Sequence, residues 1–210
     1  MRKSHRGMTN AWVAAMLFYV ASGCAIAADA VGMVVAVRGN VYIEAAGALQ
    51  PLVANASVRT GDAIVSRDGK AKIALDDGSI VSVGENTRVR IERLEHSRGF
   101  LRARLAIVSG VLRLLVAKVA PDGNFELESE TAIAAVRGTD WVVDATPDQT
   151  SVAVLKGKVA VSRRGAAAAS TVLLALPGQG TDVRRGSPPT PPIPWGPRRL
   201  ADVLARATFQ

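Results

Sequence analysis

The sequence predicts an all-β protein, a compact curled sheet, short β-solenoid or sandwich of many short strands, followed by a short C-terminal helix. Three observations predict this class. Valine and alanine supply much of an apolar fraction of 49%, whereas aromatic residues make up only 4% of the 210 residues. Short apolar runs alternate with polar residues, as in half-buried strands. Glycine-containing turns separate these runs at short intervals, and no helix of normal length is evident between Val31 and Gln179.

The first 27 residues have the layout of a secretory signal peptide, so we expect an exported, periplasmic protein. Residues 1–7 carry three positive charges, residues 11–21 are apolar, and Ala25-Ile26-Ala27 offers small residues to a signal peptidase. Cys24 is the only cysteine, which excludes a disulfide within the chain. Because Ala21-Ser22-Gly23-Cys24 resembles a lipobox, a lipoprotein anchored through Cys24 is an alternative, and an uncleaved anchor is another.

The charge balance is basic. The whole chain has a net charge of +8, and removal of the leader leaves 23 basic and 18 acidic residues. Such an excess suits an anionic partner, such as a membrane surface or an acidic glycan. A solvated basic surface is the simpler interpretation.

The domain begins near Ala30 with an alternating strand. We expect the odd-numbered residues from Val31 to Val37 to face the core, and a turn at residues 38–40 to lead into a second strand that starts with Val41 inside. Gly-x-Val-like patterns recur unevenly at Gly32, Gly39, Gly110 and Gly157, and they suggest strands that enter through similar tight turns.

Two Asp-Gly dipeptides, Asp68-Gly69 and Asp77-Gly78, predict hairpin turns because both residue types tolerate positive φ. A strand over residues 71–75 lies between them. Together with Asp76 these aspartates could suggest calcium, but their spacing does not match a calcium-binding loop, so turns explain them better.

The segment from Arg88 to Val108 is predicted to form two strands linked at residues 96–99, with arginines along one solvent-exposed face. This face is the best candidate for a binding surface. Phosphorylated lipid headgroups, acidic glycans or an acidic protein would suit it. Nucleic acid is not expected, because no aromatic residues are interleaved with the arginines, and a solvated, edge-protecting face is the alternative. Its members are Arg88, Arg90, Arg93, Arg98, Arg102 and Arg104.

Two apolar runs meet at Arg137-Gly138-Thr139. We expect Gly138 to take a backbone conformation closed to other residues, Thr139 to cap the turn and Trp141 to lie in the core. Arg137 would pair with a nearby acid, such as Glu128 or Asp140, and a ligand contact is the alternative. A further hairpin turn is expected at Lys156-Gly157, and Pro177-Gly178-Gln179 closes the block.

The β domain is predicted to span residues 30–183. Residues 184–197 read as a proline-rich linker, with six prolines between Ser187 and Pro197. Residues 198–208 read as a short amphipathic helix. A helix this short must dock on something. We expect it to dock on the domain itself, with a partner or a membrane as alternatives.

Five motifs, in order, resemble the FecR-type domain over about Gly32 to Gly180. They are Gly61-Asp62-x-Ile64, Leu75-Asp76-Asp77-Gly78-Ser79, Arg137-Gly138-Thr139, Leu155-x-Gly157-x-Val159 and Pro177-Gly178-Gln179. The resemblance implies a small all-β periplasmic domain that binds rather than catalyses. It implies mainly structural roles for Gly61, Asp62, Asp77, Gly78, Arg137, Gly138, Thr139, Gly157, Pro177 and Gly178.

The predicted function is a non-enzymatic binding or scaffold role in the bacterial cell envelope, for an unidentified envelope component or protein. In the regulators that give the family its name, a cytoplasmic segment binds a sigma factor, and only ten residues precede the apolar run here. An accessory role in signalling of the anti-sigma type is therefore the first alternative, and an envelope glycan-acting enzyme the second. His96 is the only histidine beyond the leader, and no catalytic constellation, metal site or cofactor is expected.

Overall fold

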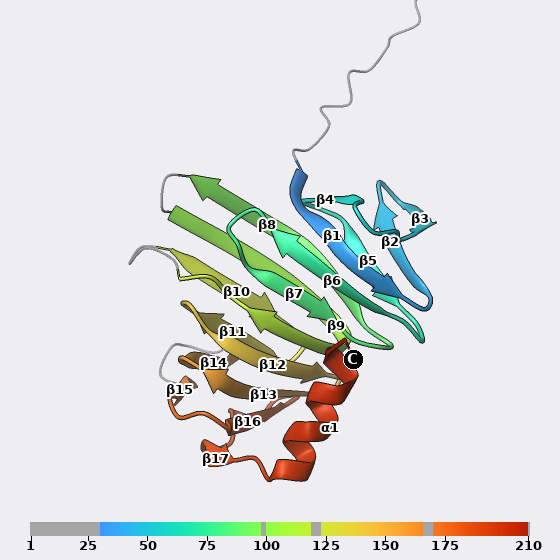
Figure 1. The fold of residues 1–210 in the computed structure, drawn as a ribbon. Helices are drawn as coiled ribbons and strands as arrows, with labels where there is room; N and C mark the ends of the chain where they lie inside the picture. Colours follow the sequence, from blue (N-terminus) through green and yellow to red (C-terminus); the bar gives the residue numbers. More distant parts are fainter. Residues whose placement is uncertain (1–29, 98–99, 119–122, 166–169, 210) are drawn as a thin grey trace, which may run out of the picture.

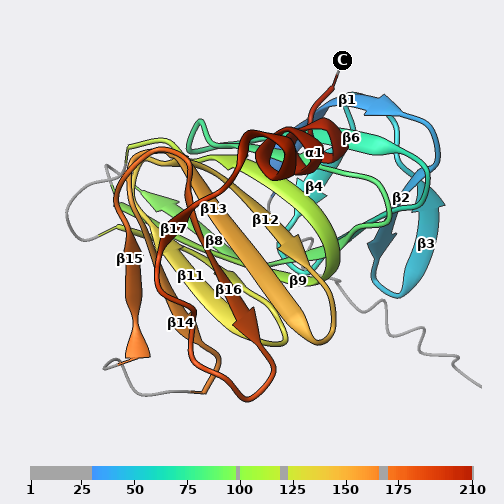
Figure 2. The same ribbon diagram turned by 90° about the horizontal axis from the view of Figure 1, so that it is seen from below.

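The molecule is a two-layered β sandwich with one helix on its outside (Figures 1 and 2). The computed structural model describes residues 30–97, 100–118, 123–165 and 170–209. Within these residues it contains 17 strands and a C-terminal helix, which confirms the all-β prediction. The predicted signal peptide, Cys24 and Arg98 lie outside the described residues.

Layer A has nine neighbouring strands, all antiparallel, in the order β4, β1, β6, β7, β9, β12, β13, β16, β17. Their bounds are Ser57–Arg59 (β4), Ala30–Arg38 (β1), Lys70–Leu75 (β6), Ile80–Val83 (β7), Phe100–Leu115 (β9), Asp140–Ala145 (β12), Gln149–Lys156 (β13), Gln179–Arg184 (β16) and Ile193–Pro194 (β17).

Layer B follows the order β3, β2, β5, β8, β9, β10, β11, β14, β15, and only its β9–β10 pair is parallel. The strands that belong to this layer alone are Ala48–Pro51 (β3), Val41–Ala45 (β2), Ala63–Ser66 (β5), Arg88–Ser97 (β8), Asn124–Glu128 (β10), Ala132–Val136 (β11), Val159–Arg163 (β14) and Val172–Leu174 (β15).

Strand β9 belongs to both layers and connects them. Its first part pairs with β8 and β10 in layer B, whereas residues 110–115 pair with β12 in layer A, where residues 112–115 also pair with β7. The strand changes layer at Gly110, whose φ of 104° favours glycine. The expectation that Gly110 opens a separate strand is therefore wrong, because the strand is continuous through the bend.

Two predicted hairpins are corners between the layers. Asp68-Gly69 joins β5 of layer B to β6 of layer A, and Lys156-Gly157 joins β13 of layer A to β14 of layer B. Strand β5 pairs with β2 and β8 but β6 pairs with β1 and β7, and β13 pairs with β12 and β16 but β14 pairs with β11 and β15, so neither turn is a hairpin. Asp77-Gly78 does join two paired strands, β6 and β7, as predicted.

The chain takes the same path twice through the sandwich. In the first unit it runs from β5 in layer B through the β6–β7 hairpin of layer A and returns to β8, which pairs with β5. In the second unit β11, the β12–β13 hairpin and β14 repeat this course, and β14 pairs with β11. The uneven glycine pattern of the sequence reflects this repeated crossing at Gly110 and Gly157, and at Gly39 between β1 and β2.

The core lies between the layers and is built mainly from valine, leucine and alanine, with Trp141 and Phe125 as its largest fully buried side chains. The expected inward parity of β1 fails in its middle, where Met33 and Val35 are 50% and 51% exposed. Two register shifts, between Ala30 and Gly32 and between Val34 and Ala36, reverse the parity over this stretch, so that Val34 faces the core instead.

The C-terminal segment crosses the outside of layer A (Figure 2). Helix α1, Pro197–Ala207, packs an apolar face on β9, β12 and β13, where it forms a second hydrophobic cluster. The preceding proline-rich segment contains β17 and the buried Trp195, so much of it lies against the domain. Among the described residues no helix has the length and apolarity needed to span a membrane.

Candidate functional site

The predicted arginine face lies on the outer side of layer B, over β8 and the first part of β9. Strand alternation places it there, because Val89, Ile91 and Leu105 on the same strands are buried. Arg90, Arg102 and other members are exposed, and Arg98 lies outside the described residues.

Acidic side chains are interleaved with these arginines. The Nη2 atom of Arg88 lies 2.6 Å from Oε2 of Glu44, and that of Arg104 lies 3.0 Å from Oε2 of Glu126. Arg93 pairs with Glu95 at 2.8 Å.

The arginine face is thus a lattice of alternating charge rather than a purely basic patch. The acids come from β2, β8 and β10, and the sequence does not show that these strands lie in the same part of the sheet. Arg102 also has an interaction partner, whereas exposed Arg90 forms no ion pair with a described residue. Exposed pairs of this kind contribute about 0–1 kcal/mol each, and they reduce the attraction of the face for an anion.

The Arg137-Gly138-Thr139 motif forms a corner between β11 and β12. Thr139 is 1% exposed, and its hydroxyl donates to the carbonyl of Lys158 at 3.0 Å. Gly157 lies beside it, and a Cβ built on Gly157 would lie 2.9 Å from the Thr139 hydroxyl. Threonine and glycine thus hold two adjacent corners together.

A second corner has the same construction. The Thr87 hydroxyl accepts a hydrogen bond from the amide of Val111 at 2.9 Å, and a Cβ on Gly110 would lie only 2.2 Å from that hydroxyl. Thr87 precedes β8 as Thr139 precedes β12, and each faces a glycine of positive φ on the neighbouring chain segment. The structural interpretation of Gly138 and Thr139 fits this arrangement.

Arg137 does not pair with the acids expected for it. Asp140 accepts two hydrogen bonds from the guanidinium of Arg113, at 3.0 and 2.8 Å, and this hydrogen bonding raises the pKa of Arg113 despite the opposing effect of burial. Glu128 pairs with Arg164 at 2.6 Å. Arg137 itself is exposed on the outer side of layer B.

The remaining motif residues make turns. Gly61, Gly78 and Gly178 have positive φ. Asp62 Oδ2 accepts a hydrogen bond from the backbone amide of Arg59 at 2.8 Å, next to Gly61.

Asp77 caps the β6–β7 hairpin by accepting from the amide of Ser79 at 3.0 Å and from its hydroxyl at 2.5 Å. At the Pro177-Gly178 turn, the Gln179 side chain accepts from two backbone amides, those of Ala175 and Leu176, at 3.0 Å each. All of these contacts are local, so these motif residues have a structural role in forming turns.

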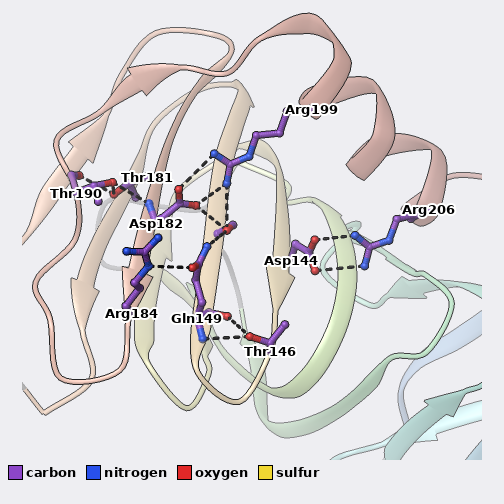
Figure 3. A network of polar contacts seen from close by, with 10 residues as sticks. Asp144, Thr146, Gln149, Thr181, Asp182, Arg184, Thr190, Arg199 and Arg206 are labelled. Carbon is purple, nitrogen blue, oxygen red and sulfur yellow. Dashed lines mark hydrogen bonds and ion pairs between the residues drawn. The ribbon is translucent and has the colours of Figure 1, made fainter.

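A polar network that the sequence did not reveal fixes the C-terminal segment (Figure 3). Arg199 of α1 donates to Asp182 of β16 at 2.5 and 3.3 Å and to the hydroxyl of Ser151 on β13 at 3.2 Å. Two turns later, Arg206 donates to both carboxylate oxygens of Asp144 on β12, at 2.7 and 3.3 Å.

Trp195 and Lys70 add further contacts that support the same attachment. The Arg199 guanidinium carbon lies 3.8 Å from the ring centroid of Trp195. The indole lies against Gly180, where a Cβ would be 2.1 Å from its Nε1 atom. Lys70 of β6 donates to the helix carbonyl of Ala205 at 2.6 Å, a position where a cation also interacts favourably with the helix dipole.

The pKa of Asp182 lies below its usual value. Burial acts to raise it, but hydrogen bonds from Arg199 and Ser151, with the charge of Arg199 and then Arg184, outweigh burial and lower it. The sequence carried one hint of this network, because Arg199 and Arg206 are seven residues apart and so lie on one side of the expected helix.

The profile of the FecR protein family matches residues 56–160, which is half of the chain and runs from before the first repeated unit to the start of β14 in the second. The chain belongs to the FecR family. The expected resemblance is thereby confirmed, and the match contains the corners at Thr87 and Thr139.

This FecR-family chain also resembles solved structures. Two crystal structures of a candidate anti-sigma factor from Parabacteroides distasonis ATCC 8503, at 1.65 and 2.50 Å resolution, match with a TM-score of 0.52 and 19% identity. Each match covers 67% of this chain and 62% of the other, so the chain spans less than two thirds of that protein's length. At this identity the likeness shows a shared fold. A comparison with curated proteins finds no match.

Proposed function

We propose that this chain is a non-enzymatic regulatory module that recognises a protein partner in cell-envelope signalling of the anti-sigma type. The observation that carries the proposal is the FecR match over residues 56–160. The similarity of the fold to a candidate anti-sigma factor supports it. This role ranks above a binding or scaffold role without signalling, which the sequence favoured, because the family is defined by a regulatory protein.

The architecture suits recognition. Corners built from a buried threonine against a glycine, such as Thr139 with Gly157, join the layers into a stiff body. A stiff body loses little conformational entropy when it binds, so its outer faces can act as pre-organised docking surfaces. Its exposed strands present fixed rows of side chains, as on the arginine face.

The proposal includes export, which rests on the signal-like layout of residues 1–27. The intact mass of the protein purified from a native envelope fraction tests this. A mass that begins at Ala28 supports cleavage by the general signal peptidase, and a lipid-modified mass that begins at Cys24 supports the lipoprotein alternative. The full-length mass in a cytoplasmic fraction would contradict export.

A transcription experiment tests the regulatory role. The gene is deleted and then complemented on the chromosome, and transcripts are compared among the three strains. We expect the genes of one alternative sigma factor to change together on deletion and to return on complementation. If the parent strain makes the protein and deletion leaves sigma-dependent transcripts unchanged, the signalling role is refuted and the binding or scaffold role remains.

Two variants separate a change on the surface from loss of the folded protein. Complementation with Arg59→Gln should restore regulation, because Arg59 is exposed, lies outside the arginine face and forms no ion pair with a described residue. Complementation with Gly110→Ala should fail together with a fall in protein level, since the substitution would disturb the fold.

A further inference from the structure

A shallow hollow lies on the outer side of layer B, apart from the arginine pairs. Its volume is about 450 Å³. Two alanines in register on β11 and β14, Ala135 and Ala160, form the floor, and Leu173 of edge strand β15 is in register with Ala160 and forms one wall. The small floor residues make this part of the sheet lower than its surroundings.

Two cations stand at one end of the hollow. Arg137 directly follows Val136 at the end of β11, and Lys158 directly precedes Val159 at the start of β14. Val136 and Val159 are a registered pair with inward side chains, so Arg137 and Lys158 continue the outward columns of Ala135 and Ala160 and face each other across the strands. Both cations line the hollow and are exposed.

Among the described residues these charges have no counterions of their own. Within the part of the chain that the structure describes, neither Arg137 nor Lys158 forms an ion pair. The nearby acids are engaged elsewhere, because Asp140 pairs with Arg113 and Glu126 with Arg104. Like charges opposite each other on antiparallel strands destabilise a sheet, so this pair costs stability unless an anion lies between them.

We propose that this hollow is the partner-binding site, and that it takes a peptide segment with an acidic side chain next to an apolar one. The carboxylate would lie between Arg137 and Lys158, and the apolar side chain would cover Ala135 and Ala160 beside Leu173. Charge complementarity selects the acid, and the apolar floor selects its neighbour. The inference rests on the proposed regulatory role only in taking the partner to be a protein.

Binding of two model peptides to the purified domain tests the proposal. The probes are the acetylated, amidated pentapeptides Val-Leu-Asp-Leu-Val and Val-Leu-Asn-Leu-Val, followed by amide NMR shifts. We expect saturable shifts at Ala135 and Ala160 with the aspartate peptide, and binding weaker by about tenfold or more with the asparagine peptide. Equal binding of the two peptides, or shifts centred elsewhere, would overturn the proposal.

Charge variants locate the site. Arg137→Gln with Lys158→Gln should abolish binding of the aspartate peptide, whereas Arg59→Gln with Arg198→Gln removes the same charge from exposed positions outside both the hollow and the arginine face and should leave binding unchanged. Binding that survives in the first pair, or is lost equally in both pairs, would show that net charge rather than the hollow attracts the peptide.

A third variant separates function from stability. Lys158→Glu places opposite charges across the strands and should raise the melting temperature while it abolishes peptide binding. A lower melting temperature would show that Lys158 serves the fold, which would contradict the proposal.

Two further arms distinguish other anions. If inorganic phosphate or phosphatidylglycerol vesicles bind through Arg137 and Lys158 while the peptide does not, the peptide site is refuted in favour of an anion or lipid site. If the peptide binds at the hollow but deletion of the gene leaves sigma-dependent transcription unchanged, the signalling role is refuted and the peptide site remains.

Discussion

Replacing Gly110 by alanine tests whether close approach at the corners holds the two layers together. Gly110 has a φ of 104°, a conformation that costs an alanine roughly 1–2 kcal/mol. The new Cβ would also lie 2.2 Å from the Thr87 hydroxyl and 2.4 Å from its Cα atom. The backbone must shift, and such overpacking costs about 1–3 kcal/mol. The sum is a destabilisation of roughly 2–5 kcal/mol, a large part of the ~5–15 kcal/mol that stabilises a typical domain.

Gly61→Ala is the matched control. Gly61 has a φ of 95°, and a Cβ there would meet nothing within 4 Å. Its cost should therefore be the backbone term alone, about 1–2 kcal/mol. Urea unfolding of the two variants measures both free energies, and thermal unfolding should show about 2–4 °C per kcal/mol for a chain of this size.

Two outcomes would refute this reasoning about Gly110. A cost no greater than that of Gly61→Ala would show that the corner tolerates the methyl group. Thr87→Ser removes the threonine methyl but keeps the Cα atom that lies 2.4 Å from the new Cβ. If Thr87→Ser rescued Gly110→Ala, the clash would involve only that methyl, and close approach of the backbone would not explain the cost.

The remaining predictions concern the C-terminal segment and the arginine face. Trp195→Ala should cost about 3–5 kcal/mol and expose residues 185–209 to proteases, whereas Ile193→Ala, at a side chain that is 55% exposed, should do neither. Asp182 has a lowered pKa in the folded protein, so its contribution is present above the ordinary aspartate value of about 3.9 and is lost as pH falls through the lowered pKa. The protection of the α1 amides against hydrogen exchange, measured relative to the intrinsic exchange rate at each pH, should therefore fall on acidification, and Asp182→Asn should show low protection already at neutral pH. Arg88→Gln should cost at most about 1 kcal/mol by urea unfolding, and Arg90→Gln less, because only Arg88 has a carboxylate partner within 2.6 Å; a larger loss at Arg90 would contradict its solvated position.

Local patterns in the sequence predicted the strands but not how they connect. Alternation identified β6, β8 and the first part of β9, and Asp77-Gly78 identified a true hairpin. Asp68-Gly69 has the same composition and makes a corner, because a turn dipeptide specifies only its own φ and ψ values. Whether the next strand pairs with the previous one or crosses to the other layer depends on contacts far along the chain, such as Arg38 and Val41 beside Gly69.

The candidate sites show the same limit. The sequence placed the arginines on one exposed face, because strand period alone decides which way a side chain points. It did not show their counterions, since Glu44 and Glu126 lie 44 and 22 residues from their partners Arg88 and Arg104. The expected partners of Arg137 were wrong for the same reason, because pairing across a sheet depends on strand order.

The residues that identify the family and the residues that would select a partner are different sets with one overlap. Asp62, Asp77 and Thr139 shape turns and corners through local or inward contacts, so the family match reports mainly on the fold. Arg137 belongs to the same motif as Thr139, yet its side chain points outward, is exposed and forms no ion pair with a described residue. A rigid corner is a favourable support for a binding cation, because the fold itself fixes where the charge stands. Sequence motifs that carry a fold can therefore also carry a recognition residue, and Arg137 is the position at which the two roles would meet.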